Sequence, residues 1–222
     1  MDEPNIPQWV TDRLSHVLPT LSEYFPSDSL VMGGGTVLQA RWNHRISTDI
    51  DLFADSHTFQ RVISTSASNL EQGLYRIVRL DSKRSWVEAN TIYCEIEGTE
   101  LTVMPTDVLT FGDSGYVVPN TTVKTEISAA ILHKKIRGRM IGGGEYEIRD
   151  LYDLYMAIER DPESLQQAIQ AIPRRSLLHI TAMLQSLPVH WFDETTTPLI
   201  GVEDPPSPRT LIQKLIQCFE EM

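Results

Sequence analysis

Asp49 and Asp51 are the two residues whose type and spacing point most directly to chemistry. They alternate with Ile50 and Leu52, which is the pattern of a β-strand with one polar face. Side chains two positions apart on a strand point the same way, so both carboxylates face one point, about 7 Å apart at the backbone. Such a pair repels itself unless a cation lies between, and Mg²⁺ binds one or two carboxylates together with substrate phosphates. The pair therefore predicts a Mg²⁺ site.

A glycine-rich turn, Gly33 to Thr36, precedes this pair and follows a short apolar segment at residues 29–32. Glycine leaves backbone N–H groups open to a phosphate, and the start of the helix expected at residues 37–42 adds a favourable dipole. Alone, such a turn is most often only a turn, and an Asp-x-Asp is most often a solvated strand face. The thirteen positions from Thr36 to Asp49 allow a short helix and a return to a neighbouring strand, which favours one shared site.

The elements expected around these motifs form a mixed α/β half and then a helical half, which we assign to two domains, residues 1–122 and 123–222. Alternation predicts strands at residues 29–32, 47–53, 75–80, 86–97 and 100–104, with a hairpin at Gly98-Thr99 and a stop at Pro105. Helical periodicity predicts helices at residues 8–25, with a kink or break at Pro19, and at 37–42, 58–74, 127–140, 148–160, 162–172, 176–187 and 208–222, with a surface loop over 189–208.

Composition limits the class of protein. The chain has 222 residues, of which 41% are hydrophobic and 22% charged, values typical of a globular protein. Its two cysteines, Cys94 and Cys218, match no metal spacing and indicate free thiols in a reducing compartment. The sequence has no recognisable signal peptide and no run of about 20 apolar residues, so we expect a cytoplasmic protein without membrane contact.

The net charge of -11 repels nucleic acid at long range, so any polyanion must meet a local basic patch. The best candidate is the cluster Lys134, Lys135, Arg137 and Arg139, followed by three glycines. The alternative is a charged helix end, where cations are favoured in any case.

The order of these motifs resembles the nucleotidyltransferase superfamily built on the DNA polymerase β-like palm. More narrowly, the chain is similar to the AbiEii/AbiGii toxin family of bacterial nucleotidyltransferases over roughly residues 29–155. The resemblance implies an α+β fold in which a mixed sheet flanked by helices is followed by a helical C-terminal half. The matching residues are Gly34-Gly35-Thr36, Leu38, Arg41, His44-Arg45, Ser47, Asp49-Ile50-Asp51, Leu52-Phe53, Lys135-Ile136-Arg137 and Arg149-Asp150-Leu151-Tyr152-Asp153-Leu154-Tyr155.

The resemblance implies a role for each matched residue near the turn. Asp49 and Asp51 would be catalytic and hold Mg²⁺, while Gly34, Gly35 and Thr36 would bind the β- and γ-phosphates of the nucleotide.

Arg45 and Ser47, just before the carboxylates, would belong to the nucleotide site. Arg45 either contacts a phosphate or neutralises Asp49, and the residues alone do not decide between these roles.

In the helical half, the resemblance implies that Lys135 binds the triphosphate and that Arg149 and Asp150 close the nucleotide site or position the acceptor. Lys135 and Asp150 would then be catalytic. Asp153 lies three residues after Asp150 on nearly the same helix face, so the two can exchange roles.

The sequence departs from the superfamily at the third carboxylate, which usually stands on a neighbouring central strand. Here that strand carries Thr102 and Met104 near its end, and Glu100 or Glu95 remains as a substitute. Without a third carboxylate the site loses a general base for the acceptor hydroxyl.

The function expected from this resemblance is Mg²⁺-dependent transfer of a nucleoside monophosphate from an NTP to RNA, with a tRNA 3′ end as acceptor and pyrophosphate as product. The protein would be a toxin with a protein antitoxin encoded nearby. The alternatives are an NTP-binding regulatory protein with a degenerate site, and nucleotidyl transfer to a small molecule, since an acidic protein suits a cationic acceptor.

Overall fold

The computed structural model describes residues 4–26, 28–78, 84–107, 115–188, 190–191 and 199–221. By its contacts the chain divides into a sheet unit, Met1–Arg41 with Ser47–Glu126, and a helical unit, Trp42–Ile46 with Ile127–Met222. The sequence places the domain boundary after residue 122, whereas the contacts change at Glu126 and assign the short segment Trp42–Ile46 to the helical unit. None of the described helices is both long and apolar enough to cross a membrane.

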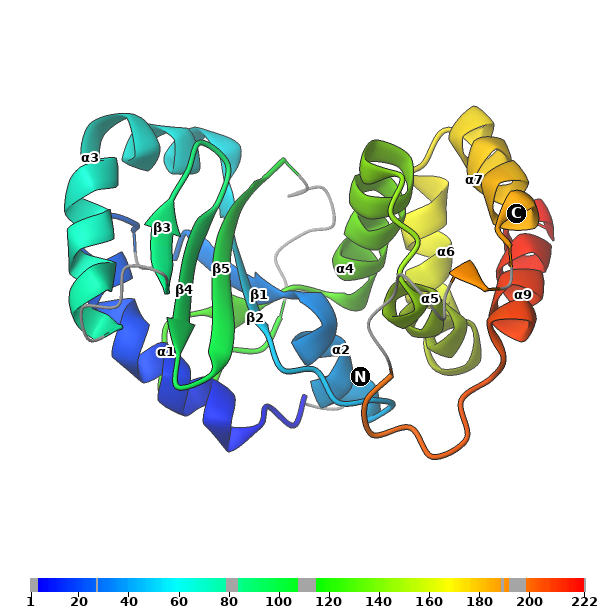
Figure 1. The fold of residues 1–222 in the computed structure, drawn as a ribbon, viewed down its shortest axis with the longest axis horizontal. Helices are drawn as coiled ribbons and strands as arrows, with labels where there is room; N and C mark the ends of the chain where they lie inside the picture. The colour runs from blue at the N-terminus through cyan, green and yellow to red at the C-terminus, as the bar shows by residue number, and fades with distance from the viewer. Residues whose placement is uncertain are drawn as a thin grey trace. The chain divides into compact units, whose positions relative to one another are not determined.

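The sheet unit is built on a six-stranded mixed sheet in the order β3-β4-β5-β2-β1-β6 (Figure 1). Its strands are β1 (Leu30–Gly33), β2 (Ile50–Asp55), β3 (Ser85–Val87), β4 (Ile92–Ile96), β5 (Thr99–Thr106) and β6 (Lys124–Thr125). The pairs β2–β5 and β1–β6 are parallel, and the other neighbours are antiparallel. The strand that carries Asp51 therefore lies inside the sheet, between β1 and β5.

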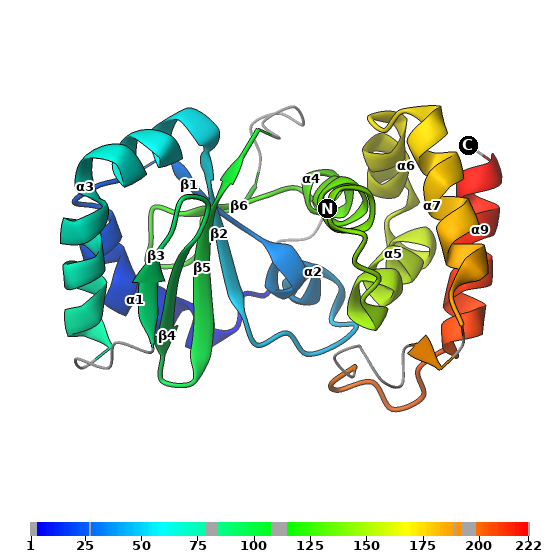
Figure 2. The same cartoon turned by 45° about the horizontal axis from the view of Figure 1, so that its top comes forward.

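Alternation gives the sheet one buried face and one face that is partly open. Helices α1 (Gln8–Leu21) and α3 (Ser56–Ile77) lie together along one side of the sheet (Figures 1 and 2). One face carries apolar side chains that are fully or almost fully buried, among them Ile50, Leu52, Ile92, Cys94, Leu101 and Val103. The residues between them, which include Asp51, Tyr93, Glu95, Glu100 and Thr102, remain half-buried or exposed on the opposite face, which we call the open face.

Local chemistry sets the ends of α3. The Asp55 carboxylate caps the helix by accepting a hydrogen bond from the Thr58 backbone N–H at 2.9 Å. The Thr58 hydrogen bonds lower the pKa of Asp55, against the opposing effect of burial. Phe59, Val62 and Leu70 line the buried stripe of the helix.

Some expected elements differ in the structure. The strand expected at residues 75–80 is wrong, because Tyr75–Ile77 continue α3, and residues 79–80 lie outside the described residues. The strand expected at 86–97 is interrupted between β3 and β4, and β6 was not predicted. Pro105 does not stop β5; β4 pairs with β5 only as far as Val103, so the missing N–H of Pro105 leaves no partner on β4 unsatisfied.

The helical unit contains α4 (Ser128–Lys134), η1 (Lys135–Gly143), α5 (Ile148–Arg160), α6 (Pro162–Gln170), α7 (Arg174–Ser186) and α9 (Pro208–Glu221). The helix expected at 127–140 is an α-helix only to Lys134 and continues as a π-helix, which ends at Gly144 in the left-handed conformation. The helix expected at 148–160 has those bounds in the structure. Both cysteines are free thiols, as predicted.

Candidate functional site

The expected site residues fall into two groups. Gly34, Gly35, Thr36, Ser47, Asp49 and Asp51, with Glu95 and Glu100, belong to the sheet unit, whereas Arg45, Lys135, Arg149 and Asp150 belong to the helical unit.

Gly34 and Asp51 are in direct contact. Gly33 is the β1 partner of Asp51, and Gly34 then begins α2 (Gly34–Trp42) with φ of 71°. A Cβ atom at Gly34 would overlap the Asp51 carboxylate. Glycine is therefore required twice, by the left-handed backbone and by the carboxylate that lies against it. The carboxylate stands at the positive end of the helix dipole, beside backbone N–H groups that suit an anion.

Thr36 connects the glycine turn to the strand of carboxylates. Its hydroxyl donates to the main-chain oxygen of Asp49 at 2.5 Å, and the side chain is almost fully buried. The turn and the Asp49–Asp51 segment are thus held together, as their spacing predicts. Ser47, also buried, is fixed to α2 because its backbone N–H donates to Gln39 Oε1 at 2.7 Å.

The position beside Asp51 on β5 is occupied by Thr102. The two residues are register partners, and the Thr102 hydroxyl donates to Asp51 Oδ1 at 3.0 Å. Glu100 lies two positions earlier on the same face and is the register partner of Glu95 on β4. Within the described part of the chain, no three His, Cys, Asp or Glu side chains gather as a metal site. Glu95 and Glu100 as third ligands therefore remain predictions.

Glu126 is an acidic residue of this region that sequence reasoning missed. It follows β6, its backbone N–H donates to Met32 O at 2.8 Å, and its side chain is buried. A Cβ atom at Gly33 would overlap its carboxylate, so the Glu126 carboxylate lies against Gly33, the register partner of Asp51. Arg41 donates to the Glu126 main-chain oxygen. The only signal in the sequence would have been the two-residue strand β6, which is too short to recognise by periodicity.

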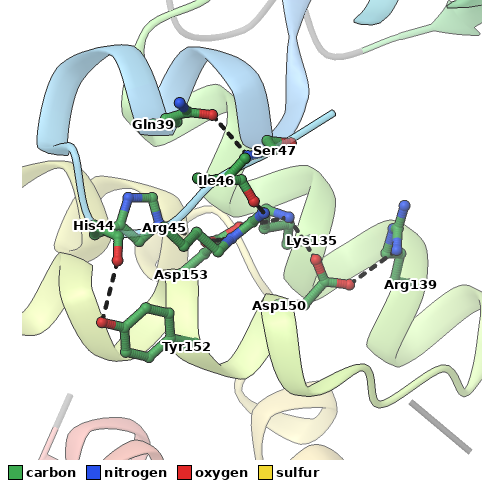
Figure 3. A network of polar contacts seen from close by, with 10 residues as sticks. All are labelled: Gln39, His44, Arg45, Ile46, Ser47, Lys135, Arg139, Asp150, Tyr152 and Asp153. Atoms are coloured by element: carbon green, nitrogen blue, oxygen red, sulfur yellow. Dashed lines mark hydrogen bonds and ion pairs between the residues drawn. The ribbon is translucent and has the colours of Figure 1, made fainter. Parts of the chain in front are cut away.

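In the helical unit, Asp153 is a fully buried carboxylate surrounded by cations (Figure 3). Arg45 binds it through two hydrogen bonds, Nε to Oδ1 at 2.7 Å and Nη2 to Oδ2 at 2.9 Å. Lys135 Nζ lies 3.0 Å from Oδ2, and His44 Nε2 lies 2.6 Å from Oδ1. Burial alone would raise the pKa of Asp153, but Lys135 and Arg45 hold it well below its usual value.

Lys135 also binds Asp150, so one ammonium group bridges two carboxylates. Its Nζ lies 2.5 Å from Asp150 Oδ1, and Arg139 Nη1 lies 3.1 Å from Oδ2. Burial opposes the charge of Asp150, yet Lys135 and Arg139 keep its pKa below the usual value. Lys135 is the first residue of the π-helix, a type of element often found at functional sites. Arg149, half-buried, precedes Asp150 in α5.

His44 is packed as a structural residue. Its side chain is fully buried, its ring stacks on Tyr152 at a centroid distance of 5.7 Å, and Trp42 meets it edge-on at 5.4 Å. The Tyr152 hydroxyl donates to His44 O at 3.4 Å, and Arg160 donates to Trp42 O. Ile46 pairs with Ile200 as an isolated bridge. The segment Trp42–Ile46 is therefore fastened to the helical unit along its length.

The guanidinium group of Arg45 binds the Asp153 carboxylate through two hydrogen bonds in a planar pair. The structure thus shows Arg45 paired with Asp153, and neutralisation of Asp49 by Arg45 remains a prediction. A phosphate contact by Arg45 remains a prediction.

Solved structures with a similar fold are known. The crystal structure of JHP933 from Helicobacter pylori matches with a TM-score of 0.50 and 12% identity, over 97% of this chain and 94% of that chain. Weaker matches are the antibiotic-resistance factor ANT(2'')-Ia, with a TM-score of 0.37, 18% identity and coverage of 80% and 92%, and the STING-associated CdnE c-di-GMP synthase from Capnocytophaga granulosa, with 0.37, 13%, 95% and 78%. At 12% identity, the match to JHP933 supports the fold alone. No curated protein matches the sequence.

A mixed sheet, a glycine turn that opens a helix, and two carboxylates at the start of the next strand are the features expected of a nucleotidyltransferase. The family model of the nucleotidyl transferase AbiEii toxin, from type IV toxin–antitoxin systems, matches residues 16–199, so the chain belongs to this family.

Substitution of Gly34 separates backbone strain from the contact with Asp51. Gly98 is a matched control, because it also has a positive φ, 78°, but a Cβ there meets no atom within 4 Å. We expect Gly98→Ala to lower the free energy of unfolding by about 1 kcal/mol. Gly34→Ala should cost about 1–2 kcal/mol more, because the Asp51 carboxylate must move. Urea unfolding of both variants measures the difference, and equal losses would contradict the contact.

Removal of the Asp153 carboxylate should be strongly destabilising. Asp153→Ala leaves Arg45 and Lys135 buried with less compensation, for which we expect a loss of about 3–5 kcal/mol in the free energy of unfolding. Asp12→Ala, at an exposed position of α1, is the control and should change stability by less than about 0.5 kcal/mol. A loss below about 1 kcal/mol for Asp153→Ala in chemical denaturation would refute this account.

The lowered pKa values of Asp150 and Asp153 also set the direction of the pH dependence. A carboxyl group with a lower pKa in the folded state contributes stability above its unfolded value of about 3.9, and this contribution is lost as the pH falls further. We expect the stability of the wild type to fall from about pH 4 downward. The Asp153→Asn variant should be less stable than the wild type at pH 7, and its free energy of unfolding should decrease less steeply as the pH falls. Denaturant titrations from pH 7 to pH 3 measure both slopes, and parallel curves would argue against a charged Asp153.

Proposed function

We propose that this nucleotidyltransferase is a Mg²⁺-dependent toxin that transfers a nucleoside monophosphate from an NTP to an RNA 3′ end, with tRNA as the acceptor. The observation that carries the proposal is the contact of the Asp51 carboxylate with the first residue of α2. It joins a metal-binding group and a phosphate-binding helix end in one place. Membership of the AbiEii family supports the toxin role and an antitoxin partner.

The donor set of the sheet unit fits Mg²⁺. Asp49, directly before β2, and Asp51, on β2, are both half-buried, and the Thr102 hydroxyl donates to a single oxygen of Asp51, Oδ1. Asp49 and Asp51 would hold the ion, with phosphate and water oxygens completing its shell. When bound, Mg²⁺ neutralises charge on the triphosphate.

Groups of the protein itself would bind the phosphates and position the reacting atoms. The backbone N–H groups of Gly35 and Thr36, at the start of α2, would bind the β- and γ-phosphates. The buried Thr36 hydroxyl already donates to Asp49 O, so its contribution is to hold turn and strand together while its backbone N–H serves the phosphate. In-line displacement then requires the acceptor hydroxyl on the side opposite the departing pyrophosphate.

Lys135, Arg149 and Asp150 complete the proposed machinery in the helical unit. The support is their match to the family's later motifs and the concentration of buried ionised groups around Lys135. Lys135 would bind a phosphate through the ammonium group that now bridges Asp150 and Asp153. Arg149 and Asp150 would position the nucleotide or the acceptor.

The basic cluster proposed for RNA contact is smaller than its sequence suggests. Lys135 is buried between carboxylates and Arg139 binds Asp150, which leaves Arg137 as its exposed member in η1. The cluster therefore offers RNA less exposed positive charge than its sequence suggests.

The test is transfer of label from each α-labelled NTP into tRNA with Mg²⁺ present. We expect label from the wild type and at least a 100-fold loss in Asp49→Ala and Asp51→Ala, as for removal of a major electrostatic group. Asp12→Ala, with its exposed carboxylate on α1, should retain full activity. Both site variants should unfold at nearly the wild-type denaturant midpoint.

Two outcomes would replace this proposal. NTP binding without transfer to any acceptor would favour the regulatory protein with a degenerate site. Label in a small cationic acceptor but not in tRNA would favour small-molecule transfer, for which the carboxylates of Glu95 and Glu100 on the open face are the supporting observation.

A further inference from the structure

Trp86 and Tyr93 form a stacked aromatic pair on the sheet unit. They are register partners on β3 and β4, with ring centroids 3.7 Å apart and an interplanar angle of 14°. Trp86 is 36% exposed although it is one of the largest apolar side chains, and Tyr93 is half-buried. An exposed, pre-stacked pair is a surface on which another flat ring can continue the stack.

The pair stands in the same row of the sheet as Asp51. Tyr93 is the register partner of Thr102 on β5, and Thr102 is the partner of Asp51 on β2. Register partners share a face, which the hydrogen bond from Thr102 to Asp51 verifies. Across the strands the row therefore runs from Trp86 through Tyr93 and the short Thr102 to the carboxylate of Asp51.

Distances along this row match the size of nucleotides. Neighbouring strands lie about 4.8 Å apart, so Tyr93 lies about 10 Å from Asp51 across two strand intervals. Nucleotides stacked at about 3.4 Å each would cover that distance with three residues. Thr102, between the aromatic pair and the Asp51 carboxylate, has a small side chain and places no bulky group between them.

The order of the strands puts the pair on the acceptor side. The phosphate-binding start of α2 follows β1, on one side of β2, whereas β5, β4 and β3 lie on the other side. An in-line displacement needs leaving group and nucleophile on opposite sides of the α-phosphorus. If pyrophosphate departs toward α2, the acceptor hydroxyl approaches from the side of Thr102 and Tyr93.

The carboxylates near Trp86 and Tyr93 favour the 3′-terminal nucleoside of RNA over its phosphate groups. Glu95 and Glu100 form the neighbouring row on the open face, where Arg84 Nη1 lies 3.6 Å from Glu95 Oε1. With Asp49 and Asp51, these carboxylates outnumber the one arginine and disfavour phosphate groups. A 3′-terminal nucleoside presents a neutral diol and a base, and carboxylates accept hydrogen bonds from exocyclic amino groups. Stacking on aromatic rings does not depend on positive charge, so a base can bind beside these carboxylates.

We propose that Trp86 and Tyr93 form a stacking platform for the 3′-terminal bases of single-stranded RNA, which delivers the terminal hydroxyl toward Asp51. This inference rests on the proposed function, because it names the site of the acceptor that the function requires. The platform supplies the contribution to RNA binding that the reduced basic cluster does not.

The experiment measures binding and transfer separately, on the full chain. A single-stranded RNA of about eight nucleotides with a free 3′ hydroxyl is titrated without NTP, and its dissociation constant is compared among variants. We expect Trp86→Ala to raise it at least about 10-fold and Trp86→Phe to stay within about threefold of the wild type, because phenylalanine still stacks. Trp191→Ala is the matched control, since Trp191 is 39% exposed and lies in the helical unit; it should bind as the wild type does.

Steady-state transfer adds a second readout. Trp86→Ala should raise KM for RNA by a similar factor and leave KM for the NTP unchanged. The same RNA with a 3′-phosphate should bind the wild type more weakly than the free 3′ hydroxyl. Equal RNA binding by Trp86→Ala and the wild type, no RNA binding by the wild type, or a preference for the 3′-phosphate would each overturn the platform.

Failure of the platform and failure of the proposed function give different results. Transfer of label to tRNA that is insensitive to Trp86→Ala overturns the platform and keeps the function. RNA binding that depends on Trp86, without transfer from any NTP, keeps the platform and overturns the function.

Discussion

The ion pairs of the buried Asp153 carboxylate are the interactions that join the segment Trp42–Ile46 to the helical unit. An isolated charge with no exposed surface would be prohibitively costly, and here Arg45, Lys135 and His44 surround it. Arg45 and His44 come from the five-residue segment Trp42–Ile46, which in sequence lies between α2 and β2 but belongs to the helical unit. This segment thus supplies the partners of a buried charge on α5, and it belongs to the helical unit although its neighbours in sequence belong to the sheet unit.

That constraint bears directly on the candidate site. Only Ser47, Thr48 and Asp49 separate Ile46 from the start of β2. Two hydrogen bonds hold this short stretch within the sheet unit. The Ser47 backbone N–H donates to Gln39 Oε1, and the Thr36 hydroxyl donates to the main-chain oxygen of Asp49. These hydrogen bonds fix the start of β2 within the sheet unit, which suits the metal-binding role proposed for Asp49 and Asp51 because that role needs accurate positions.

Much of this arrangement follows from local rules that can be read in sequence. The glycine turn and the Asp-x-Asp pair were recognisable by their order and spacing, and α5 by its strong apolar period. The extent of α3 was not, since Tyr75 and Ile77 are residue types that favour strands and yet continue the helix. The π-helix from Lys135 was also missed, because the periodicity of residues 127–140 fits an α-helix as well. Partners of buried charges, such as Arg45 with Asp153, are separated by more than a hundred positions, and no local pattern encodes them.

Thr102 shows how Asp51 is held without a second carboxylate as its register partner on β5. A carboxylate at its position would stand about 5 Å from Asp51, and two such groups would repel each other in the absence of a cation. The threonine hydroxyl instead donates to Asp51 and orients it while leaving Oδ2 beside Gly34. With fewer protein ligands, more of the coordination shell of a cation must come from the triphosphate. We therefore expect metal and nucleotide to bind this enzyme together, with the glycine turn contributing to the affinity for both.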